Sequence, residues 1–537
     1  MKYFSTRGGD AELSFEEAVL TGLAPNGGLY IPEDIPALPF NWQEAWKSYS
    51  FVDLSVAVLS LYVSEEEISA AELRSLVEKS YSTFRHPDVT PLHKLDDKLF
   101  VLELFHGPTF AFKDVALQLL GNLFEFFLKR RNARKAPGEQ QERLTVVGAT
   151  SGDTGSAAIY GLRNKANVDI FILHPKGRVS PIQEAQMTTV TDPNVHNVAV
   201  KGTFDDCQDI VKSLFGDREF NEKHHLGAVN SINWARILAQ TVYYFLAYFH
   251  ARRSVSSVDA ELQFVVPTGN FGDILAGYYA KRMGLPINGL VVATNSNDIL
   301  TRFWQSGRYE KFDSTSSRGV DAAAPADGAS DGKQAVGGVK ETLSPAMDIL
   351  VSSNFERLLW YLAYGATQGP EGERRQTAGV TVDGWMKAMK ANGRVEVPVD
   401  VLELAREDFQ AERITDAQTL TTIREHFETS PSYVADPHTA VGLAAAHIVA
   451  RKNPRSVVQI VLSTAHPAKF SEAVSRALSG IPSFCFERDV LPEEFKGLLE
   501  RERRVIDVDA PDIDLVKKVI EDHVQQSAGN GSASASV

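Results

Sequence analysis

From about Leu99 onward, short runs of apolar residues alternate with glycine-rich loops and then with segments of helical periodicity. The runs are almost uniformly apolar, as is typical of strands that are buried on both faces. Strand–loop–helix units repeat in this way where parallel sheets are covered by helices. The pattern therefore predicts an α/β protein with parallel sheets. The expected units span residues 143–166, 168–190, 195–216, 262–284, 287–307 and 457–478.

The first 95 residues have a different pattern. Stretches such as 14–23 and 64–81 show helical spacing, and the Pro-rich segment 31–40 separates them. This indicates a mainly helical N-terminal region. Two other stretches, 312–342 and 525–537, are rich in Ser, Gly and Ala and have few large apolar residues. Because such segments cannot bury enough apolar surface to offset their ordering entropy, we expect a disordered insertion and a disordered tail.

Composition narrows the class of protein. Of 537 residues, 43% are hydrophobic and 23% charged, and the formal net charge is −14. This is an ordinary balance for a soluble globular protein, and an acidic chain is a poor match for nucleic acid. The two cysteines have no metal-type or disulfide spacing, and the paired histidines 224–225 lack a third ligand, so no metal is expected. We find no membrane span or targeting signal and expect a cytoplasmic protein.

The segment VVPTGNFGDILAGYY contains a glycine-rich turn at the end of an apolar run. Gly269 and Gly272 bracket the turn, and a helix is expected to begin near Asp273. Such a turn directs backbone N–H groups toward one point, and the helix N-terminus adds positive potential, which together suit a phosphate. The spacing fits neither a dinucleotide fingerprint nor a Walker loop. A glycine turn without any ligand is the alternative.

The segment TVVGATSGDTGSAAIYG, residues 145–161, has a similar layout. Its loop adds hydroxyl groups at Thr150, Ser151 and Thr154, with an acid at Asp153. Hydroxyl groups with backbone donors suit a carboxylate or a phosphate ester. Alternatively, Thr154 caps the next helix and Asp153 favours its first turn.

Lys113 lies within FHGPTFAFKDVALQ, among aromatic and small residues. A lysine in a partly apolar pocket has a lowered pKa, which leaves free amine to condense with an aldehyde. An amine, a phosphate turn and a carboxylate-binding loop in an α/β protein together indicate pyridoxal 5'-phosphate as cofactor and an amino-acid substrate.

Six motifs in order also resemble the threonine synthase family in its longer bacterial and fungal form. They are FHGPTFAFKD, TSGDTG, NSINWARILAQ, VPTGNFGDILAGYYAKRMGLP, DPHTAVG and STAHPAKF. The resemblance implies a lyase of the pyridoxal-phosphate fold-type II architecture, related to the tryptophan synthase β chain, that converts O-phospho-L-homoserine and water to L-threonine and phosphate. It implies a large cofactor domain (96–140 and 231–490), a smaller domain (141–230) and a C-terminal extension (491–537).

The resemblance also implies roles for individual residues. Lys113 matches the lysine that forms the Schiff base with the cofactor and then acts as general base. Thr464 matches the residue that faces the pyridine nitrogen. The turn residues that match the cofactor-phosphate loop are Gly269, Asn270, Phe271 and Asp273. The residues that match the substrate site are Thr150, Ser151, Asp153, Thr154, Asn233 and Arg236, the last two as binders of the substrate phosphate.

Other interpretations stay open at this point. A different fold-type II lyase, such as a serine or threonine dehydratase or a β-replacement enzyme, would share the lysine and the first glycine turn. A catalytically silent homologue could bind phosphorylated hydroxy acids. We expect the small-molecule substrate as the partner, neither nucleic acid nor a membrane, and a monomer or homodimer.

Overall fold

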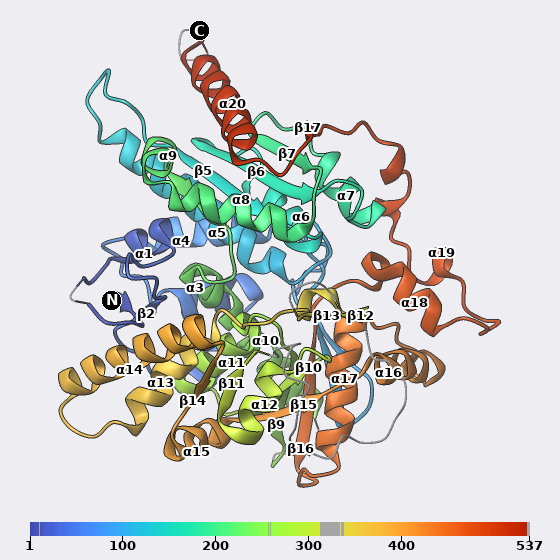
Figure 1. Cartoon of the computed structure of the whole chain (residues 1–537). Coiled ribbons are helices and arrows are strands. Elements are labelled where there is room, and N and C mark those ends of the chain that lie inside the picture. Colours follow the sequence, from blue (N-terminus) through green and yellow to red (C-terminus); the bar gives the residue numbers. More distant parts are fainter. Residues whose placement is uncertain (10, 256, 258, 312–332, 335–337, 534–537) are drawn as a thin grey trace.

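Two sheets packed with helices organise the computed structural model, which describes residues 1–9, 11–255, 257, 259–311, 333–334 and 338–533 (Figure 1). The larger sheet has six strands in the order β15-β10-β9-β16-β4-β3, and all neighbours pair in parallel except β3 with β4. Its strands are β3 (Leu92–Lys94), β4 (Leu99–Glu103), β9 (Glu261–Pro267), β10 (Gly289–Thr294), β15 (Phe409–Arg413) and β16 (Val457–Ser463).

The smaller sheet has five parallel strands in the order β17-β7-β6-β5-β8. They are β5 (Leu144–Ala149), β6 (Val168–Pro175), β7 (Val195–Val200), β8 (Leu226–Gly227) and β17 (Ile506–Val508). Strand β17 comes from the C-terminal segment, which returns to pair with β7. The mixed α/β class with parallel sheets is as the apolar runs predict.

Helices cover both sheets and form the N-terminal region. Before the large sheet come α1 (Phe15–Thr21), α2 (Trp42–Trp46), α3 (Phe51–Leu59) and α4 (Ala70–Tyr81), with the antiparallel strand pair β1 (Tyr3–Ser5) and β2 (Tyr30–Pro32). Around the small sheet lie α6 (Asp153–Leu162), α7 (Pro181–Thr188), α8 (Phe204–Gly216), α9 (Arg218–His224) and α20 (Ile513–Ala533).

The remaining helices belong with the large sheet or connect the two sheets. They are α5 (Lys113–Ala133), α10 (Trp234–Ser254), α11 (Gly272–Met283), α12 (Ile299–Ser306), α13 (Phe355–Ala366), α14 (Glu371–Asn392), α15 (Val399–Asp408), α16 (Asp416–Glu428), α17 (Pro437–Ala450), α18 (Ser471–Ala477) and α19 (Phe486–Asp489). Minor strands are β11 (Arg308–Glu310), β12 (Lys333–Gln334), β13 (Lys340–Glu341) and β14 (Arg394–Glu396).

The main apolar core explains where a site can form. It joins the N-terminal helices, α5, α10 and one face of each sheet. Every residue of α10 from Trp234 to Phe249 is buried, because this helix is apolar on nearly all sides and packs on both α5 and α11. Strands β5, β9 and β16 end beside this shared core, so the loops that follow them meet between the two sheets (Figure 1).

The structure describes only part of the two segments that the sequence predicts to be disordered, 312–342 and 525–537. Residues 312–332 of the 312–342 segment lie outside the described residues, whereas Lys340 and Thr342 are hydrogen-bonded to Asn297 and Asp348. In the tail, helix α20 continues to Ala533, so only residues 534–537 lie outside the described part.

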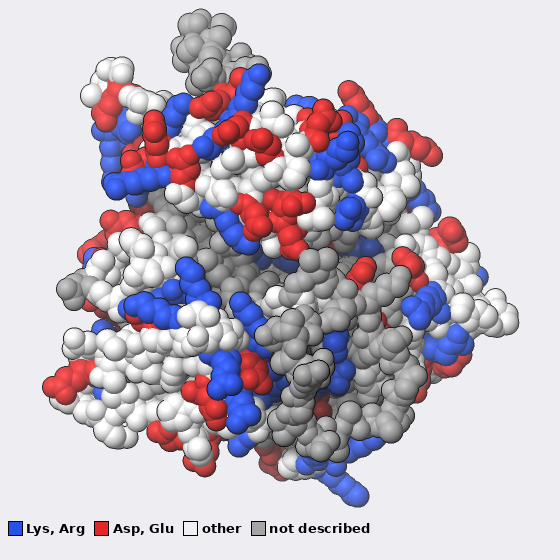
Figure 2. Space-filling view, in the orientation of Figure 1, with Lys and Arg blue, Asp and Glu red and all other residues white. Residues whose placement is uncertain are grey.

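The surface carries its charge in mixed form. On the face shown in Figure 2, Lys and Arg side chains lie among Asp and Glu side chains over both halves of the molecule. Both signs of charge are therefore mixed on this face, although the whole chain has a formal net charge of −14. Among the described residues, no helix combines the length and the apolarity that crossing a membrane would require.

Candidate active site

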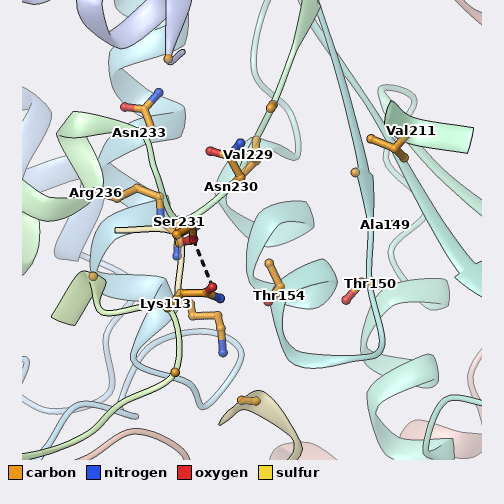
Figure 3. A pocket seen from close by; sticks show the side chains of 18 of the residues that line it. Lys113, Ala149, Thr150, Thr154, Val211, Val229, Asn230, Ser231, Asn233 and Arg236 are labelled. Carbon is orange, nitrogen blue, oxygen red and sulfur yellow. Dashed lines mark hydrogen bonds between the residues drawn. The ribbon is translucent and has the colours of Figure 1, made fainter. Parts of the chain in front are cut away.

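A cavity of about 990 Å³ lies between the two sheets. Its wall is built from the loops after β5, β9 and β16, from the start of α5 and from the start of α10. Figure 3 shows Lys113, Ser231 and Arg236 on one side of the cavity and Thr150 and Thr154 on the other. Predicted site residues that line it are Lys113, Thr150, Ser151, Thr154, Asn233, Arg236, Gly269, Asn270, Phe271, Asp273 and Thr464. Asp153 does not line it.

Lys113 is the first residue of α5 and directs its amine into the cavity (Figure 3). The ammonium nitrogen is 4.8 Å from the centre of the Phe112 ring and has no hydrogen-bond partner among the described residues. Burial lowers the pKa of Lys113, and Lys469 and Arg236 lower it further, against the opposing effect of Asp153 and Asp114. Burial thus increases the share of the neutral, nucleophilic form of this amine.

The turn after β9 has the geometry of an anion site. Phe271 adopts a positive φ of 63°, and α11 then begins at Gly272. Side chains from the segment before α13 fix the turn: Ser352 donates to the Gly269 carbonyl at 2.7 Å and Asn354 to the Asn270 carbonyl at 3.1 Å. A Cβ at Gly269 would lie 2.9 Å from the Ala346 carbonyl oxygen, so only glycine allows this approach.

Arg236 lies in the first turn of α10 and lines the same cavity. It is 4% exposed, and its guanidinium has no carboxylate or hydrogen-bond partner among the described residues. Burial lowers its pKa to about 10, which leaves it charged at neutral pH. A buried cation without a counter-ion is costly, so the cavity is suited to an anion at this point.

Asn233 caps the helix that carries Arg236. It is the N-cap of α10, where its Oδ1 accepts from the Ala235 N–H at 3.1 Å and its Nδ2 donates to the Val19 carbonyl at 2.8 Å. Both ends of its amide are therefore engaged in holding the start of α10. This arrangement positions Arg236, while the second N–H of the Asn233 amide makes no hydrogen bond among the described residues and Asn233 lines the cavity.

The loop after β5 is organised from within. The Thr150 hydroxyl accepts from the N–H groups of Gly152 and Gly155 at 3.0 and 2.9 Å. Helix α6 begins at Asp153 with Gly152 as its N-cap, so Thr154 does not cap the helix and its side chain lines the cavity. Ser151 is exposed at the rim of the loop.

The Asp153 carboxylate, in the loop after β5, is bonded to other parts of the chain. Its carboxylate pairs with Lys469 at 2.7 Å and accepts from the Gln183 amide at 2.9 Å. Burial would raise the pKa of Asp153, but Lys469 and Lys113 outweigh it and hold the pKa below its ordinary range. Lys469 also donates to the Thr109 carbonyl at 2.8 Å. This pair joins the loop to the turn before Lys113.

Thr464 follows β16 and lines the cavity next to the start of α5. Its carbonyl accepts from the Phe112 N–H at 2.8 Å, which places it beside the lysine. Its hydroxyl has no hydrogen-bond partner among the described residues. The hydroxyl can therefore serve a ligand.

The tertiary structure adds residues that the motifs did not single out. His438 lines the cavity, where its Nδ1 lies 2.8 Å from Asp436 and its Nε2 accepts from the Ala346 N–H at 3.2 Å. Asp436 is the N-cap of α17. Ser231 and Ser353 also line the cavity, and small polar residues of this kind carry no sequence signal that distinguishes them. His466 lines a second, separate hollow of about 410 Å³.

These residues fit pyridoxal 5'-phosphate. The cavity offers a free amine at Lys113, an anion-binding turn at the N-terminus of α11 and an unpartnered hydroxyl at Thr464. The amine can react with an aldehyde, the backbone N–H groups of the turn can bind a phosphate, and the hydroxyl can donate a hydrogen bond to a pyridine nitrogen.

Comparison with known proteins identifies the family. Residues 2–81 match the family model "Threonine synthase N terminus", residues 83–349 match "Pyridoxal-phosphate dependent enzyme", and residues 439–520 match "Threonine synthase, C-terminal". The threonine synthase of Schizosaccharomyces pombe is 57% identical over 97% of this chain and 98% of its own length.

Solved structures agree. The yeast threonine synthase structure superposes with a TM-score of 0.89 at 51% identity and covers 98% of this chain and 99% of its own. The pyridoxal-phosphate-bound threonine synthase of Brucella melitensis has a TM-score of 0.82 at 42% identity, covering 97% and 99%. The chain therefore belongs to the threonine synthase family of fold-type II, pyridoxal-phosphate-dependent enzymes.

Proposed function

We propose that this chain converts O-phospho-L-homoserine and water to L-threonine and phosphate with the residues of the cavity between its two sheets. The observation that carries the proposal is the placement of the Lys113 amine in one cavity with the turn at 269–273 and the unpaired Arg236. A substrate that is an amino acid with a phosphate group needs a reactive amine in the enzyme and an anion site for the substrate phosphate, in addition to the site for the cofactor phosphate. A dehydratase that acts on serine would not need this second phosphate site.

Lys113, the turn at 269–273 and Thr464 would hold the cofactor at its aldehyde, phosphate and ring nitrogen respectively. When bound, pyridoxal 5'-phosphate supplies an electron sink for negative charge on the substrate carbon. A hydroxyl at Thr464 donates or accepts a hydrogen bond but supplies no charge, which moderates that sink.

The chain's own residues then orient the substrate and move its protons. Thr150, Ser151 and Thr154 with the start of α6 suit the substrate carboxylate, and Arg236 suits its phosphate. The lowered pKa of Lys113 increases the share of neutral amine, which is the form that accepts a proton from carbon. Asp153 and Lys469 act indirectly, because their ion pair fixes the loop relative to the lysine. Holding both ends of the substrate keeps the reacting atoms within reach.

Lys113→Ala tests the assignment. We expect loss of the visible absorption of the lysine-bound cofactor and a fall in phosphate release from phosphohomoserine by roughly 10³-fold or more, because both the covalent attachment and the base are removed. Lys212→Ala is the matched control, since this lysine lines the same cavity but is exposed and paired with Asp209. Persistence of absorption and phosphate release in Lys113→Ala would contradict the proposal.

A substrate comparison separates the family's reaction from that of other lyases with this fold. Phosphohomoserine should release phosphate and give threonine, and serine should not turn over at a comparable rate. Turnover of serine alone would favour a dehydratase. The domain limits, the cytoplasmic location, the absence of a nucleic-acid partner and the monomeric or dimeric state stay predictions.

A further inference from the structure

Two segments that are distant in sequence form the anion-binding part of the cavity wall. One is the turn at 269–271 before α11, and the other is the segment 230–233, which leads into α10 and so to Arg236. Ser231 and Arg236 lie on the same side of the cavity (Figure 3). The relative position of the two segments sets the distance between an anion bound at the turn and an anion bound at Arg236.

The side chain of Asn354 joins these two segments. Its Nδ2 donates to the Ser231 carbonyl at 3.0 Å and to the Asn270 carbonyl at 3.1 Å, and its Oδ1 accepts from Nη1 of Arg357 at 2.5 Å. An arginine can only donate and a carbonyl can only accept, so these partners fix the orientation of the amide. The Asn354 backbone N–H also donates to the Asn270 carbonyl, at 3.1 Å. The amide is therefore the part of the residue that reaches the segment before α10.

Helix capping does not account for this asparagine. Asn354 is the N-cap residue of α13, a position where an asparagine side chain commonly accepts from a backbone N–H of the first turn. Among the described residues its side chain makes no such bond. The residue is 0% exposed and lies behind the residues that line the cavity. Its effect on a ligand must therefore act through the two segments that it holds.

Neighbouring side chains hold the same segments one at a time. Arg357 is also fully buried, and its guanidinium donates to the carbonyls of Ile232 at 2.6 Å and Tyr30 at 3.0 Å, which ties the segment before α10 to α13 and β2. The Ser352 hydroxyl donates to the Gly269 carbonyl at 2.7 Å and so supports the turn. The amide described above is the group that connects the turn with the other segment directly.

We propose that Asn354 is a positioning residue that fixes the distance between the cofactor-phosphate turn and Arg236. The inference rests on the proposed function, which places the cofactor phosphate at the turn and the substrate phosphate at Arg236. Two hydrogen bonds from one nitrogen hold the segments at a single spacing, so the two anion sites keep their relative position. Loss of this donor allows each segment to move independently and weakens binding at both sites.

Asn354→Asp tests the donor with little change in shape. The carboxylate keeps an acceptor for Arg357, but it replaces the N–H groups by an oxygen that faces two carbonyl oxygens. Pyridoxamine 5'-phosphate is the probe for the turn, because it carries the phosphate but has no aldehyde to react with Lys113. We expect its dissociation constant for the full chain freed of cofactor, measured by calorimetry, to rise by roughly 2- to 10-fold. The rise is moderate because the backbone bond to the turn remains.

The same substitution should have a larger effect at the substrate site. The segment before α10 loses its bond to the residue, so the KM of the cofactor-saturated enzyme for phosphohomoserine should rise by roughly 5- to 50-fold. In the Arg236→Gln background, Asn354→Asp should raise the KM by a smaller factor, because the arginine through which it acts is absent. Ser352→Ala loses a bond to the turn alone, so it should weaken pyridoxamine 5'-phosphate binding and raise the KM less than Asn354→Asp does.

Asn194→Asp is the matched control. The Asn194 amide likewise donates to two carbonyls, those of Leu162 and Val168, each at 2.9 Å, and its Oδ1 accepts from the Asn164 N–H at 2.9 Å. It precedes β7 on the small sheet, away from the residues that line the cavity. This control should lose stability and leave both the dissociation constant and the KM unchanged.

Unchanged constants in folded Asn354→Asp, or equal changes in Asn194→Asp, would overturn the proposal. If Asn354→Asp does not fold, Asn354→Ser is judged by the same two constants, since it also removes the amide. Phosphate release by the unmodified chain together with unaltered constants in the variant refutes the role of Asn354 alone. No phosphate release by the unmodified chain refutes the proposed function, and the pyridoxamine 5'-phosphate constant then still decides whether Asn354 supports the turn.

Discussion

At the scale of single residues, the site is defined by groups whose bonding within the protein is incomplete. Most buried polar groups in a protein are hydrogen-bonded, so a buried group without a partner indicates strain or a ligand. Arg236 Nε and Asp273 Oδ2 share this state among the described residues, and both residues line one cavity with Lys113 and Thr464. In contrast, Asn233 and Asp153 are bonded within the chain: Asn233 caps α10 and reaches the Val19 carbonyl, and Asp153 Oδ1 meets Lys469 and Gln183. These contacts fix the loops and helix starts around the cavity.

Arg236→Gln is expected to raise the KM for phosphohomoserine by roughly 10- to 100-fold, because a hydrogen bond to a charged group contributes about 1.5–3 kcal/mol. The free energy of unfolding should not fall, since the substitution removes a buried charge that has no counter-ion. Initial rates over a range of substrate concentrations and thermal unfolding check both outcomes.

Arg236→Lys is the matched control, since it keeps the charge but loses the planar pair of donors. Its KM should lie between those of the unmodified chain and Arg236→Gln. A normal KM with reduced stability in Arg236→Gln would make Arg236 a structural residue.

At the scale of elements, the starts of helices α5, α6, α10 and α11 all contribute to the cavity wall. Each start has its own local device: a lysine as first residue of α5, a glycine N-cap on α6, an asparagine N-cap on α10 and a glycine turn before α11. Convergent N-termini produce positive potential, which suits a cofactor and a substrate that both carry phosphate.

Gly152→Ala tests the device at α6. Gly152 has φ +152°, and a Cβ there would lie 2.3 Å from the Gln183 side-chain oxygen. We expect displacement of the 150–154 loop, a higher KM for phosphohomoserine, a stability loss of about 1–3 kcal/mol and unchanged cofactor absorption.

The control for this change is Gly177→Ala. Gly177 also has a positive φ, +71°, but open space surrounds its missing Cβ. The control should lose about 1 kcal/mol of stability through backbone strain alone, with no change in KM. Equal effects of the two substitutions on KM would refute a specific steric role for Gly152.

At the scale of the whole molecule, the small and large sheets are held together beside the site by a buried ion pair. Asp153 begins α6 on the small sheet, and Lys469 follows β16 of the large sheet. The C-terminal segment adds a second connection, because it leaves the large-sheet region and supplies β17 and α20 to the small sheet. The geometry of the cavity therefore depends on contacts between parts that are distant in sequence.

Lys469→Met should lower the free energy of unfolding at neutral pH by about 3–5 kcal/mol, because it leaves the Asp153 carboxylate buried without its main partner. The pKa of Asp153 is lowered in the folded state, so the stability from its ionised form is present above the ordinary pKa of an aspartate and is lost as the pH falls. The difference between variant and unmodified chain should therefore shrink in acid.

Denaturant unfolding at several pH values measures this difference. The double variant Asp153→Asn with Lys469→Met should recover part of the loss, since it removes both members of the pair. Additive losses in the double variant, or a difference that does not depend on pH, would show that the ion pair is not the cause.

The amino-acid sequence by itself determined the α/β class, the strands β5, β6, β7, β9, β10 and β16, the glycine turn before α11 and the helix that follows Phe112. These features depend on local causes: apolar runs, residues that tolerate special backbone angles, and a motif around Lys113. Local pattern did not reveal β17, the cap role of Asn233, the Asp153–Lys469 pair, or the unpartnered states of Arg236 and Asp273. Only the tertiary structure decided these, because pairing and desolvation depend on which distant residues pack against a group, and a linear pattern does not contain that information.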